Sequence, residues 1–256
     1  MTAQVTTRKP SDTHSGESHS GGVYPRRRAA RIAGVSYLAM FLLAIFANFV
    51  VREGLIEPGN ASGTVANIRE SIGLFRLGLA AFLAIFVLDV VIAWALHVIF
   101  RDVNRDVSLV TAWFRLIYTA LLGVALVSMF QVLQVLGGES LGFLTSTQVN
   151  TQTMIELSSF ESTWLIGLVA FGIHLAMLGV LISRSGLVAK ALGYVLFAAG
   201  MAYVLDTLAR GMLADYEAVA GVFLVAVAVP SMIGEGWLGL WLLLTKKLEA
   251  RTTNAQ

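Results

Sequence analysis

The sequence predicts an all-α membrane protein, a polytopic bundle of six transmembrane helices with both termini in the cytoplasm. Hydrophobic residues make up 57% of the 256 residues and charged residues only 13%, whereas soluble domains are about 25% charged. The mean hydropathy of +0.76 is strongly positive. Six long apolar runs follow one another, and none alternates apolar and polar residues as a strand does. Composition and pattern therefore both indicate an integral membrane protein.

Helices are expected where the chain stays apolar for long enough to cross a bilayer. The runs are residues 31–51, 73–100, 108–136, 161–183, 188–208 and 219–245. Each reaches the length of about 20 residues that a transmembrane helix needs, and a helix satisfies its own backbone hydrogen bonds in lipid. Short connections predict that helices two and three, and helices four and five, are antiparallel neighbours.

The polar ends of the chain divide it into three expected segments. Residues 1–25 are rich in Ser, Thr, His and Gly, and they predict a disordered polar cytoplasmic tail because they cannot bury enough apolar surface to fold. The transmembrane domain covers 26–247, and 248–256 form a short cytoplasmic tail. The stretch "RRRAAR" at Arg26–Arg31 precedes the first run. A twin-arginine export signal is the alternative, but the run is long for a cleaved signal, so we expect an uncleaved helix.

The distribution of Lys and Arg sets the expected orientation, because these residues concentrate in cytoplasmic loops. With the N-terminus inside, the cytoplasmic segments carry Arg26, Arg27, Arg28, Arg31, Arg101, Arg105, Arg184, Lys190, Lys246, Lys247 and Arg251. The basic residues of the opposite side are Arg52, Arg69, Arg76 and Arg210. Both termini are therefore expected to be cytoplasmic.

Two outer connections are long enough to carry structure of their own. In residues 52–72, Pro58, Gly59 and Asn60 predict a turn, and residues 64–71 are suited to a short interfacial helix. Residues 137–160 begin with "GGES" and are polar and acidic. We expect them to form a loop.

The sequence excludes several classes of chemistry. There is no cysteine, which rules out disulfides, thiolate metal sites and thiol catalysis. We find no GxSxG nucleophile motif, no HExxH metal motif and no glycine-rich phosphate loop after a strand. The net charge of +2 is small and sits mostly in the flanks. We expect no cofactor and no nucleic-acid partner.

Four ionisable residues lie deep inside the predicted helices. A charged side chain at the bilayer centre costs roughly 2.5–3.5 kcal/mol on insertion scales, so such residues are usually paired and often functional. Counting from the helix ends at about 1.5 Å per residue places Asp89, His174 and Glu235 at nearly one level on three helices. Arg115 lies nearer the cytoplasm and about one turn from Asp89. These four residues are our candidates for ligand binding or proton relay.

Each candidate also has a structural interpretation. Asp89 and Arg115 would form a buried ion pair between adjacent helices, and His174 would be a neutral ring hydrogen-bonded across helices. Glu235 would be a protonated carboxyl hydrogen-bonded inside the bundle. Asp89, His174 and Glu235 would also suit zinc, iron or manganese, but no spacing in the sequence supports a metal site.

The surroundings of Glu235 favour a binding site over a plain structural helix. Pro230 lies five residues earlier and removes a backbone donor, which can kink the helix. Gly234, Gly236 and Gly239 would let a neighbouring backbone or a ligand approach closely.

A secondary cluster is expected near the outer surface. Its members are Arg76, Glu161, Asp206 and Arg210. Asp206 and Arg210 are four residues apart and can pair on one helix face. Charged residues at helix ends commonly pair with neighbours, so a structural role is the stronger interpretation here.

Several stretches resemble one family along most of the chain. They are "RIAGVSYLAMFLLAIFANFVVREGLIEPGNASGTVANI", "LFRLG", "FRDVNRDVSLVTAWFRL", "WLIGLVAFGIHLAMLGVLISRSGLVAKALGYVLFAAGMAYVLD" and "GEGWLGLWLLL". Over residues 29–247 the chain resembles an uncharacterised bacterial membrane family, the domain of unknown function four-three-eight-six. Ala189 stands where the family usually has a proline. The resemblance implies about six helices in the bacterial inner membrane and no particular activity.

Three classes of function remain open. A small transporter-like or ligand-binding bundle would take a small or amphipathic solute at the midplane, with His174 changing charge near neutral pH. A structural or regulatory membrane subunit would use the same charges only to join helices. An intramembrane enzyme acting on lipid is the third. The bilayer is the expected partner, and Gly172 with Ala176 offers a small-residue face for a homo-oligomer.

Overall fold

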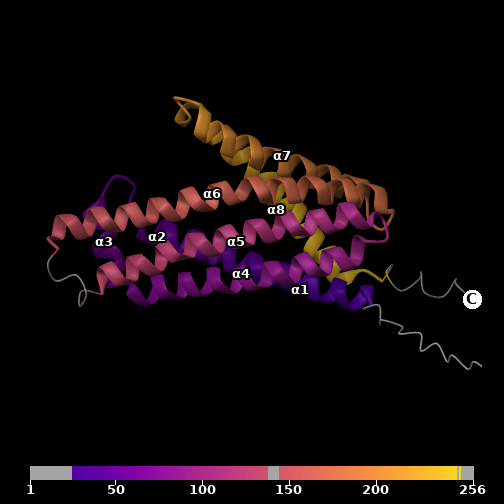
Figure 1. The fold of residues 1–256 in the computed structure, drawn as a ribbon, viewed down its shortest axis with the longest axis horizontal. Coiled ribbons are helices and arrows are strands. Elements are labelled where there is room, and N and C mark those ends of the chain that lie inside the picture. The colour runs from indigo at the N-terminus through magenta and orange to yellow at the C-terminus, as the bar shows by residue number, and fades with distance from the viewer. Residues whose placement is uncertain (1–24, 138–143, 247, 249–256) are drawn as a thin grey trace, which may run out of the picture.

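Figure 1 shows the computed structural model of the protein, in which residues 25–137, 144–246 and 248 are described. The expected tails, apart from residues 25 and 248, lie outside these residues, as do Lys247 and the start of the loop predicted at 137–160. The elements are α1 (Arg26–Ile45), the π-helix η1 (Phe46–Arg52), α2 (Glu53–Leu55), α3 (Ala61–Glu70), α4 (Ile72–Phe100), α5 (Arg105–Leu136), α6 (Ser146–Ser185), α7 (Lys190–Met212) and α8 (Glu217–Leu244).

The predicted all-α architecture with six membrane-spanning helices is confirmed within the described part of the chain. Six helical segments there are long and apolar enough to cross a membrane, namely Arg26–Leu55, α4, α5, α6, α7 and α8. The first of them joins α1, η1 and α2 without a break. The turn at Pro58–Gly59 is present, with Gly59 in the left-handed region, where glycine has no steric penalty. The short helix expected after this turn is α3.

The loop expected over residues 137–160 is largely wrong, because α6 already begins at Ser146. Thr145 and Gln148 form a capping box, in which each side chain satisfies the backbone N–H of the other. At about 1.5 Å per residue, a helix of 40 residues is about 60 Å long, twice the hydrocarbon core of about 30 Å. α6 is therefore too long to lie wholly within the hydrocarbon region.

The six spans close into a ring. Each span packs against the next one along the chain, and α8 packs back against α1. The predicted neighbours α4 and α5, and α6 and α7, are among these pairs. In Figure 1, α1 begins and α8 ends at one end of the bundle, which we call the tail end. α3 lies at the other end, which we call the loop end, and there α7 diverges from α6.

Glycines bring α6 and α7 into backbone contact. A Cβ atom added at Gly172 would lie 2.6 Å from the carbonyl oxygen of Gly200, and one added at Gly193 would lie 2.6 Å from that of Gly179. A Cβ at Gly200 would also meet the backbone of Ala176. The Gly172–Ala176 face that suggested a homo-oligomer is therefore used inside the chain. The expectation of a homo-oligomer loses this support.

Candidate functional site

A partly open cavity of about 550 Å³ lies between the spans. All six spans contribute to its walls. One polar or aromatic lining residue from each span is Tyr37 of α1, Asp89 of α4, Tyr118 of α5, Phe171 of α6, Tyr203 of α7 and Glu235 of α8. Most other lining side chains are apolar. We call this space the central cavity. It combines a few polar groups with apolar walls, as ligand pockets do.

Arg115 is a fully buried hub beside the central cavity. Its Nε and Nη2 atoms donate to Asp89 Oδ1 at 2.9 and 2.5 Å. Its Nη1 atom donates to the Tyr37 hydroxyl at 3.0 Å and reaches His174 Nε2 at 3.1 Å. The guanidinium thereby connects α1, α4, α5 and α6. Three of the four predicted midplane residues, Asp89, Arg115 and His174, thus lie in direct contact.

His174 is held by hydrogen bonds at both ring nitrogens. Nδ1 lies 2.9 Å from the carbonyl oxygen of Thr111, and Nε2 faces Arg115. Because the guanidinium can only donate and the carbonyl can only accept, the ring must be neutral with its proton on Nδ1. A second ring proton would point at the Arg115 cation. This geometry argues against our expectation that His174 changes charge near neutral pH.

Asp89 is fully buried, yet only one of its oxygens is satisfied. Both Arg115 donors go to Oδ1, and Oδ2 has no hydrogen-bond partner among the described residues. Buried polar atoms almost always have a partner because an unmet hydrogen bond is costly. Asp89 is one of the residues that line the central cavity, so this unmet acceptor belongs to the wall of the cavity.

Glu235 lines the same cavity from α8. It is half-buried, and no hydrogen bond joins its carboxyl to another residue that the structure describes. It is close enough to Asp89 and Arg115 to interact with their charges. The expectation of a carboxyl hydrogen-bonded within the bundle is therefore not met, and Glu235 is available to a ligand.

The glycines around Glu235 divide into two kinds. A Cβ at Gly234 would meet Leu196 at 2.8 Å, and one at Gly239 would meet Tyr37 at 3.0 Å. These two glycines allow α8 to pack against α7 and α1. A Cβ at Gly236 would meet nothing within 4 Å, although this residue lines the cavity. Gly236 therefore leaves open space at the wall of the cavity.

The metal interpretation of Asp89, His174 and Glu235 does not fit these contacts. Both nitrogens of His174 are engaged by Arg115 and Thr111, and the Arg115 cation lies between the ring and Asp89. Within the described ranges, no group of three or more His, Cys, Asp or Glu side chains is placed to hold a metal ion.

The predicted outer residues form separate groups. Glu161 lies 3.9 Å from Arg52, whose guanidinium carbon is 5.2 Å from the centre of the Phe160 ring. Arg76 is exposed, and no ion pair joins it to another described residue. Asp206 and Arg210 form the expected pair at 3.4 Å. These contacts do not bring the four residues together into one cluster.

Tyr216 completes the pair of Asp206 and Arg210. Its hydroxyl donates to Asp206 Oδ1 at 2.5 Å, and the Arg210 guanidinium carbon lies 4.5 Å from its ring centre. Burial and this hydrogen bond raise the pKa of Tyr216 to about 12. The hydroxyl stays protonated and closes the link between α7 and α8, so a structural role suits this group.

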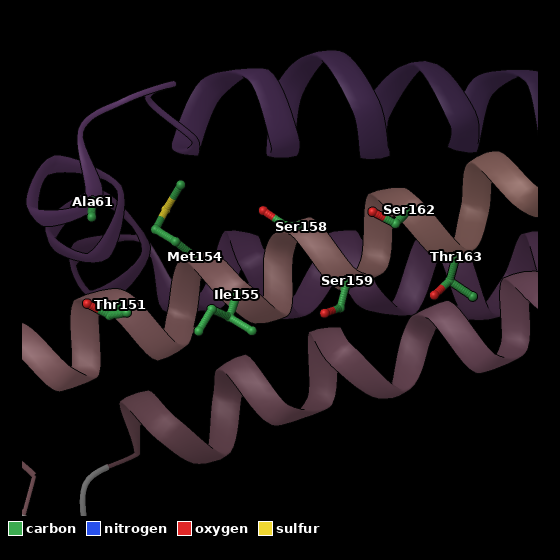
Figure 2. A pocket seen from close by; sticks show the side chains of 8 residues that line it. All are labelled: Ala61, Thr151, Met154, Ile155, Ser158, Ser159, Ser162 and Thr163. Carbon is green, nitrogen blue, oxygen red and sulfur yellow. The ribbon is translucent and has the colours of Figure 1, made fainter. Parts of the chain in front are cut away.

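An open groove of about 640 Å³ lies beside the first half of α6. Figure 2 shows its lining, in which all labelled residues except Ala61 of α3 belong to α6. The polar ones are Thr151, Ser158, Ser159, Ser162 and Thr163. It carries hydroxyls but no ionisable side chain, and it is wide open. The central cavity has the chemistry that this groove lacks.

Comparison with known proteins places the chain in a family. A family model described as a domain of unknown function, DUF4386, matches residues 32–245. The chain belongs to this family. It is also 28% identical over 160 residues to an uncharacterised protein of Archaeoglobus fulgidus, covering 62% of this chain and 78% of the relative. That relative is archaeal, and the bacterial origin stays an expectation. No solved structure matches the chain.

In this DUF4386 protein, the tyrosines are the cavity residues that sequence reasoning missed. Tyr37, Tyr118 and Tyr203 line the central cavity, and none of them was among the candidates from the sequence. Counting from the tail end of each helix would have found them, since Tyr37 lies as deep in α1 as Asp89 lies in α4. The same count applies to all six spans.

Proposed function

We propose that the protein binds a small or amphipathic solute in the central cavity, as a transporter or solute-binding bundle does. One observation carries this proposal: a cavity shared by all six spans holds two carboxyl groups with free acceptors, Asp89 Oδ2 and Glu235. Its volume of about 550 Å³ falls within the usual range of roughly 300–1,000 Å³ for ligand pockets.

The hub around Arg115 supports this proposal because it fixes the geometry of the site. Four helices hold the guanidinium, so the Asp89 carboxylate cannot turn away from it. A site that is rigid before binding loses less entropy when the ligand arrives. Glu235 stands on α8, whose apolar stretch is the least buried among the six spans. The site therefore has a rigid part around Arg115 and a less tightly packed part on α8. This difference would allow α8 to move when a solute enters.

A retained solute is the first expected result. Native mass spectrometry of the purified protein should detect a small molecule on the wild type, and Glu235→Gln should lose it because the acceptor charge is gone. Glu217→Gln, an exposed carboxyl at the start of the same helix, is the matched control and should retain it. A wild type without any bound molecule would contradict the proposal, and so would a bound molecule that the Glu235→Gln variant retains.

A structural or regulatory subunit is the second candidate, and the Arg115 hub also favours it. A residue that ties four helices together would stabilise a bundle with no ligand at all. The two functions predict different effects of a substitution at Glu235. This residue makes no hydrogen bond to any residue in the described ranges. If the role is purely structural, Glu235→Gln should change neither bound mass nor stability.

We further propose that the tail end faces the cytoplasm and that the membrane is the bacterial inner membrane. The excess of Lys and Arg at this end supports the orientation. Because the chain has no cysteine, single introduced cysteines can measure the orientation of the protein in the membrane directly. In intact cells, a membrane-impermeant maleimide should label Glu70→Cys at the loop end. It should label Asp106→Cys at the tail end only after permeabilisation, and the reverse pattern would refute this orientation.

A further inference from the structure

We infer that the ligand of the central cavity is a hydrophobic ammonium ion, a protonated amine that carries an apolar group. This inference rests on the proposed function and specifies its solute. It is carried by the juxtaposition of two carboxyl groups with unpaired acceptors and aromatic residues in the lining of one cavity, with a saturated guanidinium beside it.

The charges facing the cavity are not balanced. Its ionisable neighbours are Tyr37 from α1, Asp89 from α4, Arg115 and Tyr118 from α5, His174 from α6, Tyr203 from α7 and Glu235 from α8. Phenols are neutral at pH 7, and the contacts of His174 require a neutral ring. Two carboxyl groups then face a single cation. Because an uncompensated charge is costly in an apolar surrounding, Glu235 in its ionised form calls for one further positive charge.

Arg115 cannot serve an anionic ligand in return. A guanidinium has five N–H donors, and all five have partners in the structure. Nε and one N–H of Nη2 go to Asp89, the other N–H of Nη2 reaches Met40 Sδ at 3.5 Å, and the two of Nη1 go to Tyr37 and His174. A carboxylate or phosphate in the cavity would meet the charges of Asp89 and Glu235 without reaching this cation. An amine, which brings N–H donors, matches the free acceptors.

The walls suit the rest of such a molecule. Tyr37, Tyr118, Phe171 and Tyr203 are aromatic residues of the lining, and aromatic faces attract cations. The Arg115 guanidinium already lies by the rings of Tyr37 and Phe171, so Tyr118 and Tyr203 are the rings that remain for a ligand. Glu235 lies nearer than Val227 to the tail end, where α8 ends at Leu244. The lining continues toward the loop end along the first span and α8 with apolar side chains such as Phe49 of η1 and Val227 of α8. An apolar group can extend in that direction.

Three probes of one shape and different charge test this inference: phenylbutylamine, phenylbutanol and phenylbutanoate. Titrations use the full protein in nanodiscs of phosphatidylcholine and follow the fluorescence of Trp164, which lines the cavity. Trp164→Phe and empty nanodiscs give the background from partitioning into lipid. The amine should bind about tenfold or more tightly than the alcohol, a difference of about 1.4 kcal/mol. The carboxylate should not bind.

Two variants and one control locate the effect. Glu235→Gln should reduce amine affinity to that of the alcohol, while Glu217→Gln should leave it unchanged. Gly236→Leu fills space where a Cβ meets nothing, so it should fold and weaken all probes. Equal binding of alcohol or carboxylate, or amine binding that survives Glu235→Gln, overturns the charge inference but leaves a solute site in place. If no probe binds, the inference fails, and the mass spectrum of the wild type decides the proposed function separately.

Discussion

Replacing Arg115 by methionine is expected to destabilise the protein by about 3–5 kcal/mol, because removing one partner of a buried ion pair leaves the other charge uncompensated. Methionine keeps much of the side-chain volume, so the loss reports the charge and its hydrogen bonds. Asp89 would lose both donors to Oδ1, and Tyr37 and His174 would each lose a partner. Thermal and denaturant unfolding of the purified protein in detergent measure this loss.

The ion pair itself is isolated by a double-mutant cycle. Asp89→Ala and Arg115→Ala should each destabilise, and the double variant should lose clearly less than the sum of the two. Arg210→Met is the control, because its pair with Asp206 is partly exposed and such pairs contribute about 0–1 kcal/mol. Additive losses at Asp89 and Arg115 would refute the coupling.

The second large effect is expected at the contact of α6 and α7. Gly172→Val should destabilise by about 1–3 kcal/mol or more, because overpacking a tight contact forces the backbone to shift. The atom that meets the new Cβ is the backbone oxygen of Gly200, at 2.6 Å, and a backbone atom cannot rotate away. Thermal unfolding in detergent measures the loss. Gly221→Val, at a glycine where a Cβ meets nothing within 4 Å, is the matched control and should remain close to wild type. Similar stability of both variants would refute the close packing.

The sequence was sufficient for features that depend on one helix or one hairpin. The spans followed from apolar length alone. Asp89 and Arg115 could be placed one turn apart because a short connection fixes the register of α4 and α5, and the structure joins them directly. Asp206 and Arg210 were predictable from helical periodicity.

Features that depend on distant parts of the chain were beyond the sequence. Nothing local indicates that α1 packs between α4 and α8 in the ring. The contact of Tyr37 in α1 with Arg115 in α5 could therefore not be foreseen. The partner of Glu161 is Arg52, on another span, for the same reason.

The start of α6 was a different kind of error, because its polar composition concealed a helical pattern. Its buried residues are Val149, Thr153, Glu156, Leu157 and Phe160, which recur every three or four positions. Such spacing is typical of a helix with one buried face. The pattern was present in the sequence, and the count of polar residues hid it.

The central claim is that the cavity beside Asp89 and Glu235 holds a solute. Native mass spectrometry of the wild type next to Gly236→Leu tests it most directly, because this change fills the cavity while removing no charge and no hydrogen bond. The account predicts a bound small molecule on the wild type and its loss from an equally stable Gly236→Leu protein. A bound molecule that persists on Gly236→Leu, or none on either protein, would contradict it.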